Sequence, residues 1–175
     1  CGSTGFWWAC CNGHKDVVQL FLNHSDRNID LNAANNLGYD AFMKSCDRGH
    51  KDVVQLLLQH SNKIELNAKG NDGMTALMYA CMNGHKKVVQ LLLNHSSDKP
   101  IELNARGNDG MTALMYACMN GNKKVVQLLL NHSSDKPMEL NARDICDRGR
   151  TALDWALYKG HFGILKLFSE HSSQM

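Results

Sequence analysis

The chain has 175 residues, of which 43% are hydrophobic and 21% are charged, and its formal net charge is +2. This composition is typical of a soluble globular domain, and the small charge does not indicate a surface for nucleic acid or for an anionic membrane. No apolar run approaches the roughly 20 residues that a membrane-spanning helix needs. Seven cysteines without a signal-peptide pattern indicate a reducing compartment, so we expect an intracellular, cytoplasmic protein. Since the chain begins with Cys1, we also expect a fragment or a processed product.

Five similar units follow one another along the chain. Each contains two glycines eleven residues apart, and successive pairs start 36, 35, 37 and 39 residues apart: Gly2/Gly13, Gly38/Gly49, Gly73/Gly84, Gly110/Gly121 and Gly149/Gly160. The third and fourth units are almost identical, because residues 66–100 and 103–137 differ only at Lys69/Arg106 and His85/Asn122. A period in this range is typical of solenoid proteins. We predict one domain of five repeats, approximately 1–34, 35–69, 70–106, 107–143 and 144–175.

Each unit predicts two short helices. Two residues after the first glycine stands a residue that can N-cap a helix: Thr4, Asp40, Thr75, Thr112 and Thr151. In the third unit we expect a helix over 75–83, which Gly84 ends because glycine tolerates the left-handed conformation. A second helix is expected over 86–95, where Val88 to Leu93 supply an apolar face. Helices below about 12–15 residues are marginal alone in water, so the units are expected to stack and to bury each other's apolar faces.

These repeated residues resemble ankyrin repeats over essentially the whole chain. The pattern is G-x-T-A-L, A-C-x-x-G-H, V-V-x-L-L-L and L-N-A, carried by Gly73, Thr75, Leu77, Ala80, Gly84, His85, Val88, Val89, Leu91, Leu92, Leu93, Leu103, Asn104 and Ala105. The resemblance implies an all-α solenoid of stacked antiparallel helix pairs, with loops or β-turn hairpins projecting from one edge and a concave surface that binds other proteins. The family's Thr-Pro-Leu-His reads Thr-Ala-Leu-Met at 75–78. Because that histidine is absent from every unit, we expect packing rather than its hydrogen bonds to connect the repeats.

The resemblance also raises a modification. Some ankyrin repeats are substrates for asparagine hydroxylation at the extended Leu-Asn-Ala, which here contains Asn32, Asn67, Asn104 and Asn141. The loop before this segment is longer than the family norm, so we expect a structural role for these asparagines instead.

The reactive side chains are interpreted as structural. Four cysteines share one repeat position, and a histidine or Asn122 follows each of them four residues later: Cys10, Cys46, Cys81 and Cys118. A Cys-x(3)-His pair could indicate a nucleophile or a zinc ligand. However, packed helices lie roughly 8–10 Å apart, whereas zinc lies about 2.0–2.3 Å from its ligands, and the intervening glycine breaks the helix. We predict buried core cysteines, with no catalytic residue, no metal and no cofactor.

A strip of methionines is the main candidate for a partner-binding surface. Met74, Met82, Met111 and Met119 are expected to be exposed, since flexible Met-rich surfaces suit partner binding, while Met78 and Met115 are expected in the core. The surrounding residues complete the predicted site: Tyr39, Asp47, Arg48, Asn71, Asp72, Asn83, Asn108, Asp109, Asn120, Arg148, Arg150, Tyr158 and Lys159. Tyrosine and arginine are enriched in binding hot spots. For the Asn and Asp residues at the turn tips, ordinary turn chemistry is an equal alternative.

The sequence therefore predicts a non-enzymatic scaffold that binds a protein or peptide of unknown identity on its concave face, without nucleic-acid binding or membrane insertion. The alternative is a structural spacer in a larger protein whose flanking domains carry the function, and an enzyme or metal site ranks last. A monomer is expected. Phe6, Trp7 and Trp8 give the first unit an apolar face, which we expect further repeats, a capping segment or dimerisation to cover. Ser169 and Glu170 make the last unit resemble a terminal cap.

Overall fold

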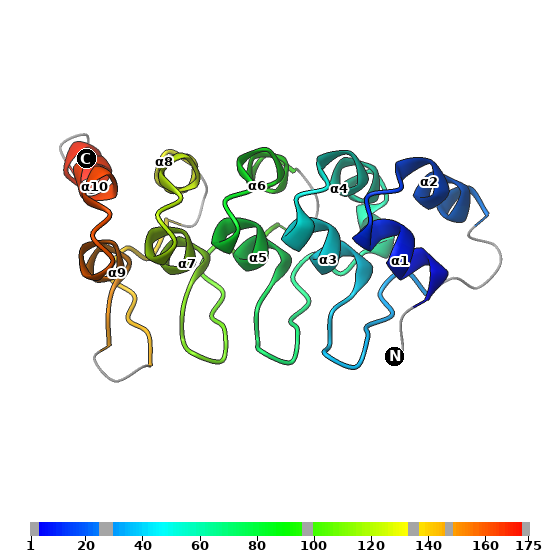
Figure 1. Ribbon diagram of the computed structural model, residues 1–175, viewed down its shortest axis with the longest axis horizontal. Helices are drawn as coiled ribbons and strands as arrows, with labels where there is room; N and C mark the ends of the chain where they lie inside the picture. Colours follow the sequence, from blue (N-terminus) through cyan, green and yellow to red (C-terminus); the bar gives the residue numbers. More distant parts are fainter. Residues whose placement is uncertain (1–3, 25–29, 96–99, 133–136, 146–148, 173–175) are drawn as a thin grey trace.

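The computed structural model describes residues 4–24, 30–95, 100–132, 137–145 and 149–172. Within these ranges the chain forms a row of five helix pairs and contains no strand (Figure 1). We call each pair a repeat and number the repeats in chain order: α1 (Gly5–Cys11) with α2 (Lys15–Asn23), α3 (Ala41–Arg48) with α4 (Lys51–Leu58), α5 (Ala76–Met82) with α6 (Lys86–Leu93), α7 (Ala113–Met119) with α8 (Lys123–Leu130), and α9 (Ala152–Tyr158) with α10 (Phe162–Ser172). A short 3-10 helix, η2 (Ser61–Lys63), follows α4. The predicted all-α solenoid is confirmed, and the exact repeat boundaries stay a prediction.

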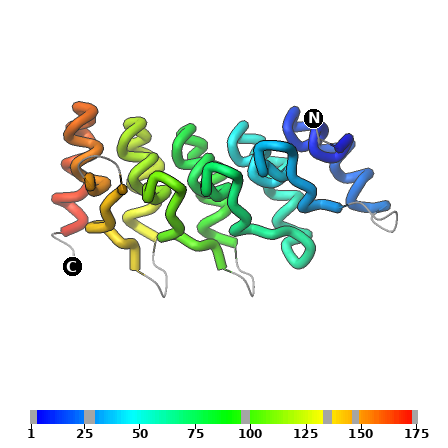
Figure 2. The backbone as a smooth tube through the Cα atoms, turned by 90° about the horizontal axis from the view of Figure 1, so that it is seen from below, coloured from blue at the N-terminus to red at the C-terminus, as the bar shows by residue number. Residues whose placement is uncertain are grey.

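The helices lie in two layers. The odd-numbered helices form one layer, the even-numbered helices form the other, and the long loops project from the odd-numbered layer (Figure 1). Figure 2 shows the units side by side from the N-terminal to the C-terminal end of the row. Helices of each layer contact their neighbours along the row, from α1 with α3 to α7 with α9 and from α2 with α4 to α8 with α10. The apolar core is therefore continuous through the stack and does not close around one centre.

Local sequence explains where the helices begin and end. Every predicted N-cap is confirmed, because each capping side chain accepts a hydrogen bond from a backbone N–H in the first turn of its helix: Thr4, Asp40, Thr75, Thr112 and Thr151. At the other end, Gly84 has a φ of 72°, a conformation that glycine adopts without steric cost. The chain turns there and enters α6 two residues later.

The residues that were predicted to fill the core do so. Cys10, Cys46, Cys81 and Cys118 are completely buried, and Leu57, Leu92 and Leu129 in α4, α6 and α8 are at most 1% exposed. Met78 and Met115 are buried as well, each beside the threonine that caps its helix. The lysines that begin α6 and α8 are exposed, which agrees with a solvated outer face.

Candidate partner-binding surface

The predicted site residues lie on the odd-numbered helices and on the loops that precede them. We use the term inner face for those of them that retain exposed or half-exposed side chains on the odd-numbered helices or within two residues of their ends: Tyr39, Asp47, Arg48, Met82, Asn83, Met119, Asn120, Arg150, Tyr158 and Lys159. They come from repeats 2 to 5, so the inner face runs along most of the stack. Arg148 lies outside the described residues.

The prediction of four exposed methionines is wrong for two of them. Met74 and Met111 are only 6% and 3% exposed, whereas Met82 and Met119 are half-buried against the core. For Met74 the reason is the loop of the following repeat: a Cβ atom added to Gly107 would lie 3.7 Å from Cγ of Met74, so this loop packs on the Met74 side chain. The continuous apolar strip is therefore reduced to two half-exposed methionines.

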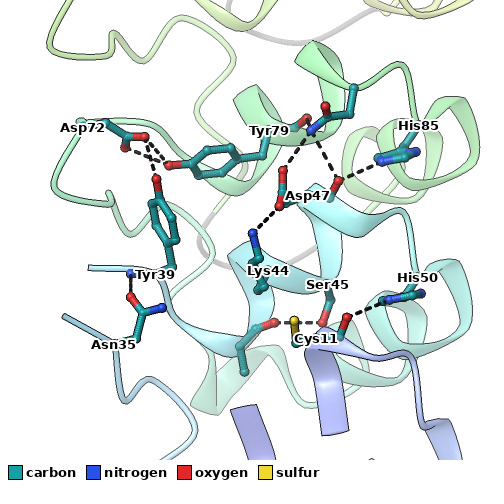
Figure 3. Close-up of polar contacts among 12 residues, drawn as sticks. Cys11, Asn35, Tyr39, Lys44, Ser45, Asp47, His50, Asp72, Tyr79 and His85 are labelled. Carbon is teal, nitrogen blue, oxygen red and sulfur yellow. Dashed lines mark hydrogen bonds and ion pairs between the residues drawn. The ribbon is translucent and has the colours of Figure 1, made fainter. Parts of the chain in front are cut away.

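Tyrosines hold the aspartates at the turn tips. The Tyr79 hydroxyl donates to both carboxylate oxygens of Asp72, at 2.6 and 2.7 Å, and the Tyr39 hydroxyl donates to the same carboxylate at 3.2 Å (Figure 3). The Tyr116 hydroxyl donates to Asp109 at 2.7 Å in the next repeat. Burial, reinforced by the hydrogen bond to Asp72, raises the pKa of Tyr79 above its usual value and keeps it a proton donor. Asp72 and Asp109 thus stabilise the loops through hydrogen bonds, which agrees with the alternative that they have a structural role in the turns.

Asparagines at the same tips connect one loop to the next. The Asn108 side chain donates to the Asn71 carbonyl at 2.8 Å, and its backbone N–H donates to the Asp72 carbonyl at 3.0 Å. Asn71 makes the equivalent bonds to Asn36 and Leu37. The sequence signal for this ladder was the recurrence of Asn-Asp-Gly at one repeat position, and the loop–loop bonds were missed.

Hydrogen bonds also connect the helices of successive repeats, contrary to the expectation from the missing family histidine. They come from the residue after the helix-ending glycine. His50 Nε2 donates to the Cys11 carbonyl at 2.9 Å, and His85 Nε2 donates to the Asp47 carbonyl at 2.8 Å (Figure 3). In repeat 4 Asn122 takes the place of histidine and donates to two carbonyls of α5 at 2.9 Å. A histidine or an asparagine at this repeat position therefore supplies hydrogen bonds between successive repeats.

The candidates for hydroxylation have structural partners. Asn67 donates to the Pro100 carbonyl at 3.0 Å and accepts from the Glu102 N–H at 3.0 Å. Asn32 and Asn104 make the same pair of bonds to the following loop. Both amide atoms are used, which confirms a structural role for these three asparagines.

At repeat 2 the inner face is polar and internally paired. Lys44 lies 2.5 Å from the Asp47 carboxylate, and the Asn83 side chain donates to the same carboxylate at 2.9 Å. Lys44, Asp47 and Tyr39 face the same side of the stack (Figure 3), and Arg48 next to them is exposed. This end of the surface therefore has fewer uncommitted polar groups than its residue types suggest.

The C-terminal end of the inner face is different, because cations stack on the exposed ring of Tyr158 and on the buried ring of Trp155. The Arg150 guanidinium carbon lies 4.8 Å from the Trp155 ring centroid and 4.4 Å from that of Tyr158, and Lys159 Nζ lies 5.5 Å from the latter. Asp144 is buried and accepts from the Trp155 indole at 2.8 Å and from the Arg150 backbone N–H at 3.0 Å. The Asp144 carboxylate is therefore used in hydrogen bonds to Trp155 and to the backbone of Arg150. Among the described residues, no acidic side chain lies within ion-pair distance of the Arg150 guanidinium.

The thiols of the stack are not poised for chemistry. Burial raises the pKa of Cys10 and of Cys118 to about 12, and burial also raises the pKa of Cys46 and Cys81 above the usual value. A thiol that stays protonated is a poor nucleophile. In the part of the chain that the structure describes, no three His, Cys, Asp or Glu side chains gather as metal ligands would. The inner face instead consists of side chains and hydrogen-bonding groups that the stack holds in fixed positions.

Comparison with known families decides the classification. A family model described as ankyrin repeats (three copies) matches the chain three times, over residues 6–104, 62–139 and 99–175. The chain belongs to the ankyrin-repeat family. Ankyrin repeats generally mediate protein–protein interactions, and ankyrin-repeat domains are typically non-enzymatic scaffolds. No curated protein sequence matches this ankyrin-repeat chain. None of its described helices combines the length and the apolar character that crossing a bilayer requires.

Proposed function

We propose that this ankyrin-repeat chain is a non-enzymatic scaffold that binds a protein or peptide partner on the concave face of the stack, through the inner face. The observation that carries the proposal is the group of exposed aromatic and cationic side chains at repeat 5. Tyr158 is exposed, and Arg150 stacks on it with no acidic side chain within ion-pair distance among the described residues. Tyrosine and arginine in this arrangement are the side chains that most often anchor a protein interface.

The scaffold suits recognition because its loops and helices are already fixed. The Tyr79–Asp72 bonds, the asparagine ladder and the histidine bonds between repeats hold the backbone before a partner arrives. A preorganised surface loses less conformational entropy on binding than a mobile one. The binding free energy then depends on the side chains that project from it.

Contacts of two kinds are available along the inner face. In repeats 3 and 4, half-buried Met82 and Met119 offer apolar area, and exposed Asn83 and Asn120 flank them. In repeat 5, Arg150, Tyr158 and Lys159 offer charge and aromatic area. A partner that lies along the stack would place an apolar segment over repeats 3 and 4 and a polar or acidic segment over repeat 5. The turn-tip residues Asn71, Asp72, Asn108 and Asp109 support this surface through their internal bonds.

The alternative proposal is a structural spacer within a larger protein. The burial of Met74 and Met111 favours it, because half of the expected apolar strip is missing from the surface. A spacer would tolerate the loss of the Arg150 and Tyr158 side chains without any change in binding.

A capture experiment separates the two proposals. The chain is immobilised and exposed to a lysate of its source cells, and bound proteins are quantified by mass spectrometry for wild type, for Arg150→Ala combined with Tyr158→Ala, and for Lys124→Ala on the exposed side of α8. The binding proposal expects a partner that wild type and Lys124→Ala retain equally and that the double variant loses. Equal recovery of a partner by all three proteins would contradict binding through Arg150 and Tyr158, and recovery of no partner by wild type would favour the spacer, provided that circular dichroism shows the same helix content for each.

A further inference from the structure

Asn-Gly dipeptides end several of the odd-numbered helices, and two of them form a matched pair. Asn83-Gly84 ends α5 and Asn120-Gly121 ends α7, each after the same residues of repeats 3 and 4, while Asn12-Gly13 lies in repeat 1. Repeats 3 and 4 both have a repeat on either side. A comparison of Asn83 with Asn120 therefore does not depend on where the chain begins or ends.

The backbone around the two asparagines is the same. Asn83 has φ and ψ angles of −91° and 1°, and Asn120 has −94° and 4°. The N–H of the glycine that follows donates to the carbonyl of Cys81 in one repeat and of Cys118 in the other, at 3.3 Å in both. Both asparagines are exposed. Backbone conformation and access to water therefore do not distinguish the two sites.

Hydrogen bonds to the preceding repeat do distinguish them. Each side-chain amide donates to a carbonyl of its own helix, at 3.1 Å for Asn83 and 3.0 Å for Asn120. The Asn83 amide also donates to the Asp47 carboxylate at 2.9 Å and to the Asp47 carbonyl at 3.3 Å. Among the described residues, the Asn120 amide makes no further hydrogen bond. The reason is that Met82 occupies in repeat 3 the position that Asp47 occupies in repeat 2.

An asparagine that precedes glycine can lose ammonia through a reaction with its own backbone. After losing its proton to hydroxide, the glycine nitrogen attacks Cγ of the asparagine, and glycine favours this attack because it has no Cβ to obstruct it. The new C–N bond closes a succinimide ring, while the side-chain nitrogen takes up a proton from water and leaves as ammonia. Water then opens the ring and leaves an aspartate or an isoaspartate. The asparagine side chain must first rotate onto the glycine nitrogen, so each hydrogen bond that holds it slows the reaction.

We propose that Asn120 is a site of spontaneous deamidation in the folded protein, and that Asp47 protects the equivalent Asn83 from the same reaction. Hydrogen bonds to a charged acceptor are stronger than those between neutral groups. The bonds to Asp47 should therefore slow the reaction of Asn83 by at least about tenfold relative to Asn120. The proposal is independent of the partner proposed for the inner face.

Deamidation at Asn120 changes the inner face and the junction beside it. Either product replaces a neutral amide by a carboxylate next to Met119. In the isoaspartate the Cβ atom becomes part of the main chain, so the backbone is one carbon longer just before Gly121. A Cβ added to Gly121 would lie 2.7 Å from the His161 ring, so this turn packs closely against repeat 5. The longer backbone should therefore loosen the junction between repeats 4 and 5.

Peptide mapping of the full chain by mass spectrometry, after incubation in mildly alkaline buffer, tests the proposal. Trypsin releases the two sites in separate peptides, 70–86 and 107–123, whose sequences differ only at His85/Asn122, and fragment ions assign each deamidated residue. In folded wild type, deamidation at Asn120 is expected to be at least about tenfold faster than at Asn83. In urea, where the bonds to Asp47 are absent, the two sites should react at similar rates.

Variants that exchange the surroundings of the two sites test the cause. Asp47→Ala removes the carboxylate from Asn83, so the rate at Asn83 should rise toward that at Asn120, while the rate at Asn120 serves as the internal control. Met82→Asp supplies the missing carboxylate to Asn120, so the rate at Asn120 should fall. Met82→Ala removes the methionine without supplying a carboxylate and should leave the rate at Asn120 as in wild type. Circular dichroism verifies that each variant is folded.

Three results would overturn the proposal: equal rates at the two sites in the folded protein, no reaction at Asn120 while the unfolded chain reacts, or an unchanged rate at Asn83 in folded Asp47→Ala. A folded Met82→Asp variant that reacts at Asn120 as fast as Met82→Ala would also contradict it. If a variant does not fold, the rates of wild type with and without urea still decide the question. None of these rates depends on a partner, so failure of the partner-binding proposal does not affect this test.

Discussion

Some repeat positions that are buried in the middle of the stack are exposed at one of its ends. Repeats 3 and 4 are nearly identical in sequence and bury Leu77 and Leu114 to the same degree, whereas repeat 5 carries Leu153 at that position and leaves it 41% exposed. The residue type and the local helix are the same in all three. The comparison teaches that burial in this fold depends on the neighbouring repeat, since no repeat covers its own apolar face.

The largest expected effect is on this matched pair of leucines. Leu77→Ala should lower the free energy of unfolding by about 2–5 kcal/mol, because it opens a cavity between two repeats. Leu153→Ala should lower it by under about 1 kcal/mol, because the side chain is already in contact with water. Urea unfolding measures both. Similar losses for the two variants would contradict a stack in which neighbours supply the burial.

The capping residues offer a second comparison. Repeat 2 begins α3 with Asp40, where repeats 3 and 4 have threonine, and this carboxyl is buried. Burial raises its pKa to about 6, against the opposing hydrogen bonds from the Met43 and Phe42 N–H groups. Since the pKa in the folded state lies above that of the unfolded chain, the carboxyl contributes stability below about pH 4 that is lost as the pH rises through about 6.

Asp40→Asn keeps a good N-cap and removes this titration. Between pH 4 and pH 7, wild type should lose about 1–3 kcal/mol of unfolding free energy through this carboxyl, and the variant should keep it. Each unit of pKa shift corresponds to about 1.4 kcal/mol. Urea unfolding of both proteins at the two pH values checks this, because the contributions of all groups that the two proteins share cancel in the difference. If the two pH profiles ran parallel, Asp40 would not be a buried ionisable cap.

The smallest expected effect concerns the histidines at the junctions. His85 donates to the Asp47 carbonyl of the preceding repeat, whereas His14 is exposed at the N-terminal end. His85→Ala should cost about 1 kcal/mol of unfolding free energy, the typical net value of such a hydrogen bond. His14→Ala should cost nothing measurable in dilute solution. Thermal or urea unfolding of the two variants compares them, and an equal cost would show that these histidines act within their own repeat.

The sequence predicts the features of this fold that have local chemical signals. A hydroxyl or carboxyl that caps a helix and a glycine that ends it act within one turn, so Thr75 and Gly84 could be interpreted without coordinates. The period then predicted that the helix pairs stack, and the absence of a second cysteine or histidine within reach predicted core cysteines.

Features that arise between repeats were harder to predict. Met74 was expected on the surface from its spacing along one helix, but the loop at Gly107, one repeat later, covers it. The Tyr39–Asp72 bond and the His85–Asp47 bond likewise join residues whose separation along the chain is close to one period. Such contacts depend on the offset between neighbouring repeats, which the period alone does not specify. The sequence therefore predicted where the residues of the candidate site lie along the inner face. It did not predict which of their side chains are exposed and which are buried or hydrogen-bonded within the stack.

Deleting parts of the fourth repeat tests most directly whether helix pairs stacked on their neighbours are the unit of this fold. Removing residues 103–139 excises one period and joins Glu102 to Leu140 in register, while removing residues 103–121 excises only half of that length and leaves α8 without its partner α7. The stacked account predicts that the longer deletion keeps the helix content per residue and a cooperative, somewhat less stable transition by circular dichroism, and that the shorter deletion loses both. A protein that tolerates the shorter deletion but unfolds on the longer one would contradict it.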